Sequence, residues 1–117
     1  VCENINYDIC TTDITGKLIV INQDLDIHFV YDGKISTGDM VRFTLRDVCC
    51  DSVGHILVAD IDNRLIHLLD EDGHLICYLR TKADKLPRPH GLFVDKEDRL
   101  WVAERFSKKN RVFQYLS

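Results

Sequence analysis

Residues 56–79 read ILVADIDNRLIHLLDEDGHLICYL, and residues 9–31 read ICTTDITGKLIVINQDLDIHFVY. The two stretches are copies of one pattern, in which short apolar runs and polar turns follow one another in the same order. A third copy follows, because DVCCDSVGHILVAD (47–60) aligns without a gap with GLFVDKEDRLWVAE (91–104). An internal repeat of this kind is stronger evidence for the architecture of a chain than any single motif.

The repeating unit has the length and strand content of a propeller blade. No window holds the i, i+3, i+4, i+7 spacing of an amphipathic helix, whereas short apolar runs bounded by Gly, Asp and Asn predict strands. In the middle unit we expect four strands, at residues 46–51, 55–60, 64–69 and 74–80. Four short antiparallel strands in a period of about 40 to 50 residues are typical of one blade of a β-propeller.

The outer units are incomplete, since the first has at most a stub of its first strand and the last has no fourth strand. The sequence predicts an all-β, partial β-propeller of about two and a half to three blades, each a four-stranded antiparallel sheet. The blade units lie at about 1–33, 45–81 and 89–117, and the segment 82–89 (KADKLPRP) is a predicted loop. Because a ring needs about four to eight blades, we expect residues 1–117 to be a propeller fragment that exposes apolar sheet faces when isolated.

The composition is that of an ordinary folded domain. The 117 residues are 45% hydrophobic and 29% charged, which excludes disordered and fibrous classes. The chain has no apolar run of membrane-helix length and no signal-peptide pattern, so we expect no membrane association. Five cysteines without a CxxC spacing favour reduced core thiols over a disulfide framework or a zinc cage, and hence a cytoplasmic protein.

The last two units carry the motif of a known repeat. PHGLFVDKEDRLWVAE (89–104) followed by NRVFQYL, and DVCCDSVGHILVADIDNRLIHLLDEDG (47–73), resemble NHL repeats: an apolar strand ending in Asp, a turn, a strand ending in VAD or VAE, then Asn-Arg and a further strand. The chain is similar to the C-terminal blades of the NHL propellers of tripartite-motif proteins. This resemblance implies a six-bladed ring that follows RING, B-box and coiled-coil segments, with the remaining blades supplied by the parent chain.

The resemblance also implies a recognition module rather than an enzyme. The parent chain would act as a RING-type E3 ubiquitin ligase, and these blades would dock a protein partner or ubiquitination substrate. An RNA-binding propeller face is the first alternative, because some propellers of the family bind RNA. A metal-dependent propeller lyase is the second, yet His90 at the entry to an innermost strand has only Arg46 as its counterpart in the preceding unit. We therefore predict no catalytic residue, no metal and no cofactor.

Repeated carboxylates favour structural roles. Asp51 and Asp95 follow the first strand of their units, and Asp13, Asp60 and Glu104 follow the second. Residues that recur in every unit are expected to cap turns by accepting backbone N–H groups, and Gly73 is expected in a hairpin turn. The remaining histidines show no metal-ligand spacing and are expected to be solvated or at the core edge: His28, His55, His67 and His74.

Charge placement separates two faces of the expected disc. The loops that join blades and the loops between second and third strands share one face, which is basic and carries the candidate binding rim: Lys82, Lys85, Arg88, His90, Arg105, Phe106, Lys108 and Lys109. The hairpin turns on the opposite face are acidic. The rim could contact an RNA backbone with Phe106 and His90 stacking on bases, form a protein-docking face, or consist of solvated loops whose lysines keep strand edges from aggregating. Protein docking leads, since the acidic remainder repels a long nucleic acid.

Overall fold

The computed structural model describes residues 2–12, 16–33, 43, 45–60, 63, 65–79, 89–104, 110–113 and 115. Strands are the only regular secondary structure among these residues. No helix long and apolar enough to cross a membrane is found in this part of the chain. The strands are β1 Cys2–Glu3, β2 Ile9–Thr12, β3 Leu18–Ile21, β4 Ile27–Tyr31, β5 Leu45–Cys50, β6 Ile56–Asp60, β7 Leu65–Leu69, β8 Leu75–Leu79, β9 Pro89–Val94, β10 Leu100–Glu104 and β11 Asn110–Phe113.

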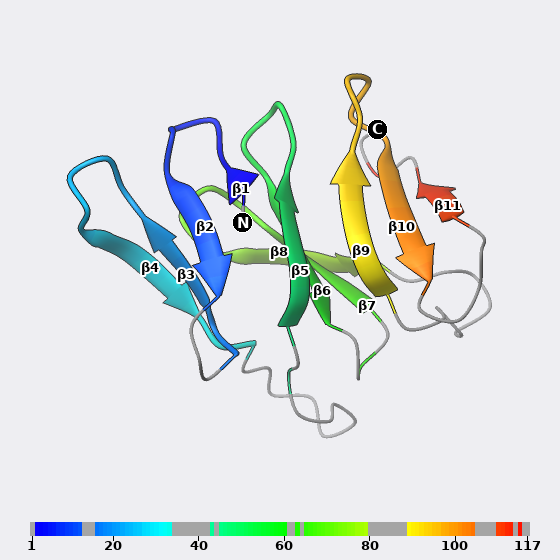
Figure 1. The fold of residues 1–117 in the computed structure, drawn as a ribbon, viewed down its shortest axis with the longest axis horizontal. Coiled ribbons are helices and arrows are strands. Elements are labelled where there is room, and N and C mark those ends of the chain that lie inside the picture. The colour runs from blue at the N-terminus through cyan, green and yellow to red at the C-terminus, as the bar shows by residue number, and fades with distance from the viewer. Residues whose placement is uncertain are drawn as a thin grey trace.

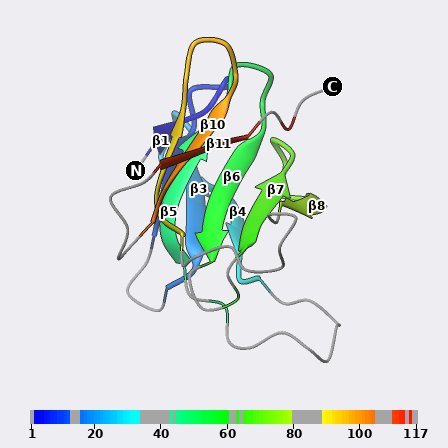
Figure 2. The ribbon, with the colours of Figure 1, turned by 90° about the vertical axis from the view of Figure 1, so that its right-hand side faces the viewer.

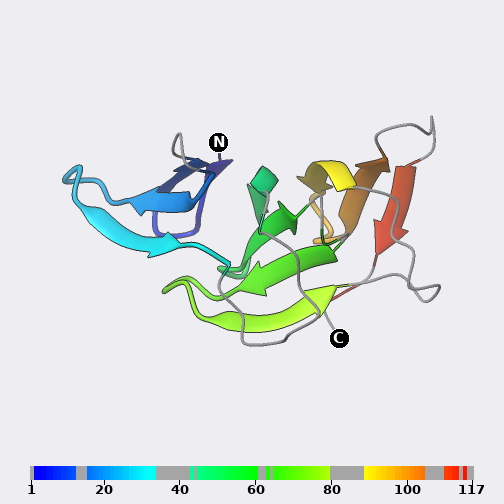
Figure 3. The same cartoon turned by 90° about the horizontal axis from the view of Figure 1, so that it is seen from below.

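The strands form three antiparallel sheets that each follow chain order. Two sheets have four strands, β1-β2-β3-β4 and β5-β6-β7-β8, and the third has β9-β10-β11. The sheets stand side by side with β5 in contact with both β1 and β9 (Figure 1). Figure 2 shows β5, β6, β7 and β8 following one another across the middle sheet, and Figure 3 shows the sheets fanned out from their first strands. The chain is a partial β-propeller, as the repeat predicts.

Local signals place the strands accurately in the middle blade. Each predicted end there lies within one residue of the ends of β5, β6, β7 and β8. The predicted loop 82–89 is wrong at its last residue, because Pro89 begins β9 and lies opposite Glu104 at a register shift. Proline is tolerated there because the first residue of a strand at a bulge does not need its N–H for the ladder.

The core lies in the two interfaces between blades. One cluster joins the first and second blades, and its buried members are Cys10, Leu18, Val20, Val48, Ile56, Val58 and Leu69. The other joins the second and third blades, with Leu57, Ile66, Leu68, Leu100 and Val102 buried. The middle blade is therefore covered on both faces, which is why every residue of β6 and β7 is buried.

The outward faces of the first and third blades are exposed. Ile9 and Val30 are 47% and 49% exposed on the first blade, and Phe93 and Val112 are 62% and 46% exposed on the third. These are the faces against which a blade packs its neighbours in a propeller. The expected exposure of apolar sheet faces is thus confirmed for these residues.

Candidate functional site

One hairpin turn of five residues occurs five times among the described residues. In each copy Oδ1 of the first residue, an Asn or Asp, accepts the backbone N–H groups of the third and fifth residues at 2.8–3.1 Å. The fourth residue has a positive φ in every copy, and the five are Tyr7, Leu25, Gly54, Gly73 and Asp98. Such a turn closes a hairpin with a left-handed residue before the second strand. The predicted roles of Asp51, Asp95 and Gly73 are confirmed.

We call the surface formed by these turns (4–8, 22–26, 51–55, 70–74 and 95–99) the turn face. Antiparallel pairing places all five turns at one end of the sheets, and Figure 1 shows four of the hairpins, β1–β2, β3–β4, β5–β6 and β9–β10, at its upper end. The five turns contain ten carboxylates, of which Asp8 and Asp51 are buried and eight are at least partly exposed, against two strongly basic side chains, Lys96 and Arg99. Its acidic character agrees with the prediction from the sequence.

Large apolar side chains project from the same turns. Leu25 is 82% exposed, Tyr7 63%, Val53 55% and Ile5 49%. Turn tips ordinarily carry polar residues, because an apolar side chain there gains nothing from folding. The turn face is therefore a mixed surface, in which apolar tips from the first two blades lie among carboxylates.

Contacts between blades join these turns into one surface. Asn6 Nδ2 donates to Glu71 Oε2 at 3.1 Å, and the Ser52 N–H donates to Asp98 Oδ1 at 3.0 Å. His28 bridges two blades, with Nδ1 3.1 Å from Asp8 Oδ2 and Nε2 3.3 Å from an oxygen of Asp72. The tips are thus held relative to one another across both blade boundaries.

A hollow of about 470 Å³ lies on the third blade beside β5, and its lining residues are Asp47 of β5 together with Gly91, Leu92, Phe93, Asp95, Trp101 and Ala103 of the third blade. The Trp101 indole N–H donates to Asp95 Oδ2 at 2.9 Å. This hydrogen bond, helped by the Arg99 backbone N–H, holds the pKa of Asp95 below its usual range. Because Phe93 belongs to the outward sheet face, the hollow is part of a blade-packing surface rather than a separate ligand site.

The prediction that His67 is solvated or at the core edge is wrong. This side chain is fully buried, because β7 is covered by both neighbouring blades. Nε2 lies 2.9 Å from Asp60 Oδ2 and Nδ1 lies 2.6 Å from the Tyr31 hydroxyl. Asp60 also accepts the Asn63 side-chain amide at 2.7 Å, so it holds its turn and the buried imidazole together.

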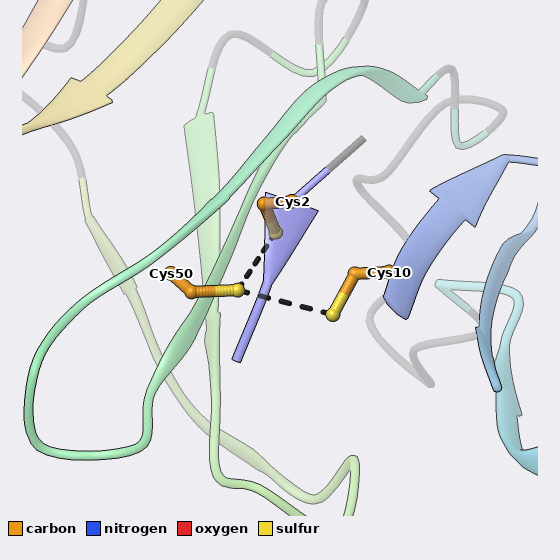
Figure 4. A group of neighbouring side chains, drawn as sticks. All are labelled: Cys2, Cys10 and Cys50. Carbon is orange, nitrogen blue, oxygen red and sulfur yellow. Dashed lines mark hydrogen bonds between the residues drawn. The ribbon is translucent and has the colours of Figure 1, made fainter. Parts of the chain in front are cut away.

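Three cysteines also meet, which the sequence did not indicate. The sulfur of Cys50 on β5 lies 2.7 Å from that of Cys2 on β1 and 3.8 Å from that of Cys10 on β2. Figure 4 shows the Cys50 sulfur facing both others. The cluster cannot be recognised from the sequence because Cys50 is far along the chain from Cys2 and Cys10. Only the packing of the first blade on the second brings Cys50 next to the other two.

The predicted binding rim is not tested by the described residues. His90 belongs to β9, but its side chain is outside the description. The other seven lie outside the described residues: Lys82, Lys85, Arg88, Arg105, Phe106, Lys108 and Lys109. The turn-capping roles of Asp13 and Glu104 are not tested either, because Asp13 lies outside the described residues and so does the side chain of Glu104.

Comparison with known proteins agrees with the architecture. No protein-family model and no curated protein matches the chain. A solved structure of streptogramin B lyase matches with a TM-score of 0.67 and 12% sequence identity, over 97% of this chain and 39% of that one. The chain therefore spans about two fifths of that structure's length. At this identity the likeness shows the fold alone, and the class that the fold defines is the β-propeller.

Proposed function

We propose that these blades form a non-enzymatic recognition module that docks a protein partner on the turn face. The proposal rests on one observation: Ile5, Tyr7, Leu25 and Val53 are exposed at turn tips among eight carboxylates that are at least partly exposed. Aromatic and aliphatic anchors with a polar surround are what protein interfaces use for affinity and for register. The complementary partner is a segment that carries Lys or Arg next to apolar residues.

The wider assignment rests on the resemblance to NHL repeats. On that basis the parent chain is a tripartite-motif-like protein of the cytoplasm that acts in ubiquitin ligation, and these blades select its substrate or partner. Chemistry then belongs to other segments of the parent, which agrees with the structural roles of Asp51, Asp95 and His67 described above.

The charge of the turn face favours a protein over RNA. Its carboxylates repel phosphates, whereas a phosphate-binding surface needs Lys and Arg. RNA binding would have to use the basic rim, whose Lys108 and Lys109 lie on the opposite side of the expected disc. The two functions therefore use different faces and respond to different substitutions.

A peptide-display selection on the purified protein tests the proposal. We expect the selected peptides to combine basic and apolar residues. We expect their binding to fall at least tenfold in Tyr7→Ser with Leu25→Ser. Ile76→Ser is the matched control, since Ile76 is 50% exposed but lies on β8, outside the turn face. Peptide binding that the double variant leaves unchanged contradicts the proposal. Polyuridine binding that weakens steeply with salt and is lost in Lys108→Glu with Lys109→Glu, when no such peptide is selected, contradicts it in favour of the RNA-binding alternative.

A further inference from the structure

The cysteine cluster lies where the first and second blades pack together. Cys2 and Cys10 are directly opposite each other on β1 and β2, and Cys50 ends β5 in the next blade. Cys10 is fully buried, whereas Cys2 and Cys50 are partly exposed. Two of the three residues are therefore partly open to solvent, and the third is covered.

The distances between the sulfur atoms distinguish a zinc site from a disulfide. Two thiolates on one tetrahedral zinc ion, with Zn–S bonds of about 2.3 Å, lie about 3.8 Å apart. Cys10 and Cys50 match that separation at 3.8 Å, but Cys2 and Cys50 are much closer at 2.7 Å. This approach is too short for two ligands of one metal ion and leads toward a sulfur–sulfur bond of about 2.05 Å.

We propose that Cys2 and Cys50 are a redox-sensitive pair that forms a disulfide between the first and second blades, with Cys10 as a third thiol able to exchange with it. The bond would join the two-residue strand β1 to β5, a strand of the neighbouring sheet. β1 pairs with β2 through only two residue pairs. Oxidation would thus fasten a short strand covalently to the next blade.

The oxidant is a small-molecule disulfide such as oxidised glutathione. The Cys50 thiol, whose pKa is raised by its contacts with Cys10 and Cys2, first loses its proton to water. It then attacks one sulfur of the oxidised glutathione, forming a mixed disulfide and releasing one glutathione thiol. The Cys2 thiolate then attacks the Cys50 sulfur and releases the second. Two protein S–H bonds are replaced by one S–S bond, and both electrons and both protons leave on two reduced glutathione molecules.

The third thiol is suited to exchange. Hydrogen bonds from the thiols of Cys2 and then Cys50 lower the pKa of Cys10, and the same contacts with Cys10 raise the pKa of Cys2 and of Cys50. A thiolate is the attacking form in thiol–disulfide exchange. Cys10 is therefore placed to attack the Cys2 sulfur from inside the interface, which forms a Cys2–Cys10 disulfide within the first blade and releases the Cys50 thiolate. The link between blades then opens while the disulfide itself is kept.

Mass spectrometry of the purified protein in glutathione buffers tests the proposal. Oxidation should remove two hydrogens and leave three cysteines open to alkylation. Cleavage after Glu3 separates Cys2 from Cys10. The peptide that is linked to the Cys50 peptide therefore shows whether Cys2 or Cys10 forms the disulfide. Cys49→Ser is the matched control for Cys50→Ser, because Cys49 is adjacent in β5 but packs against the third blade.

We expect the link in wild type and in Cys49→Ser, and its loss in Cys50→Ser and in Cys2→Ser. Because Cys2 lies in a short strand at the sheet edge, the second variant keeps the test valid if Cys50→Ser fails to fold. A disulfide to Cys50 that still forms in Cys2→Ser overturns the proposal. The absence of the disulfide from the wild-type protein at every glutathione ratio overturns it as well. Stoichiometric zinc binding that blocks oxidation and needs all three cysteines overturns it in favour of a metal site.

Discussion

The Tyr31 hydroxyl lies 2.6 Å from Nδ1 of His67, across the boundary between the first and second blades. Asp60 is 2.9 Å from the other ring nitrogen. Because a carboxylate only accepts hydrogen bonds, Nε2 donates to Asp60, and in the neutral ring Nδ1 then accepts from the Tyr31 hydroxyl. Both nitrogens of a fully buried imidazole are thereby satisfied, and one of the two partners comes from the neighbouring blade.

Tyr31→Phe should therefore destabilise the protein. The substitution leaves Nδ1 buried without this donor, which costs about 1 to 3 kcal/mol of the free energy of unfolding. Urea denaturation measures the loss. Tyr7→Phe is the control, since Tyr7 is 63% exposed and should change stability little. Equal effects of the two variants would show that the contact between Tyr31 and His67 contributes nothing.

Tyr31 and Tyr115 should make the fold sensitive to alkali. Burial raises the pKa of both phenols, and the hydrogen bond that Tyr115 donates to Asp51 at 2.7 Å raises its pKa further. A phenol with a higher pKa in the folded state stabilises the fold fully below pH of about 10 and loses that contribution as the pH rises toward the folded pKa. We expect wild type to lose more stability between about pH 8 and pH 11 than Tyr31→Phe with Tyr115→Phe. Parallel pH profiles by urea denaturation would contradict this.

Leu25→Gly should stabilise the third-to-fourth-strand turn of the first blade. Leu25 has a φ of 67°, in the left-handed region, and its side chain is 82% exposed. Left-handed backbone costs a residue with a Cβ roughly 1 to 2 kcal/mol, which exceeds the entropy that glycine adds to the unfolded chain. We expect a gain of about 1 kcal/mol by urea denaturation. Gln23→Gly in the same turn, at a position without a positive φ, should give a loss, and a loss at both positions contradicts the argument.

Trp101→Phe should raise the pKa of Asp95. The indole hydrogen bond is the main cause that holds this pKa low, and phenylalanine has no donor. A carboxyl with a lowered pKa stabilises the fold above the pKa it has in the unfolded chain and loses that contribution as the pH falls toward the folded value. An NMR titration of the Asp95 carboxyl carbon should show the rise in Trp101→Phe but not in Phe93→Leu, which changes the residue opposite Trp101. An unshifted titration in both variants contradicts the role of the indole.

Much of the fold was predictable because the same local sequence pattern occurs in each of the repeat units. Short apolar runs bounded by turn residues predict the strands, and the Asp that starts a turn is recognisable at Asp51 and Asp95. Asn4 and Asn22 start the same turn with a different side chain, so a search for a repeated Asp alone misses them.

The clusters were not predictable from local pattern. His67 becomes buried only because both faces of β7 are covered, and Tyr31 reaches it from another blade. Cys2, Cys10 and Cys50 meet through one pairing within a sheet and one packing contact between sheets. Sequence reasoning about ligand spacing assumes neighbours along the chain, whereas in stacked blades the residues that meet are a whole repeat apart.

Hydroxyl-radical footprinting with a bound display-selected peptide tests docking on the turn face most directly. Oxidation is measured at the exposed side chains of Tyr7 and Leu25, with Ile76 and Phe93 as exposed references elsewhere. The proposed docking predicts protection of Tyr7 and Leu25 and unchanged oxidation of Ile76 and Phe93. Unchanged oxidation of Tyr7 and Leu25, with protection confined to the segments 80–90 and 104–111, would contradict it and place the partner on the predicted basic rim.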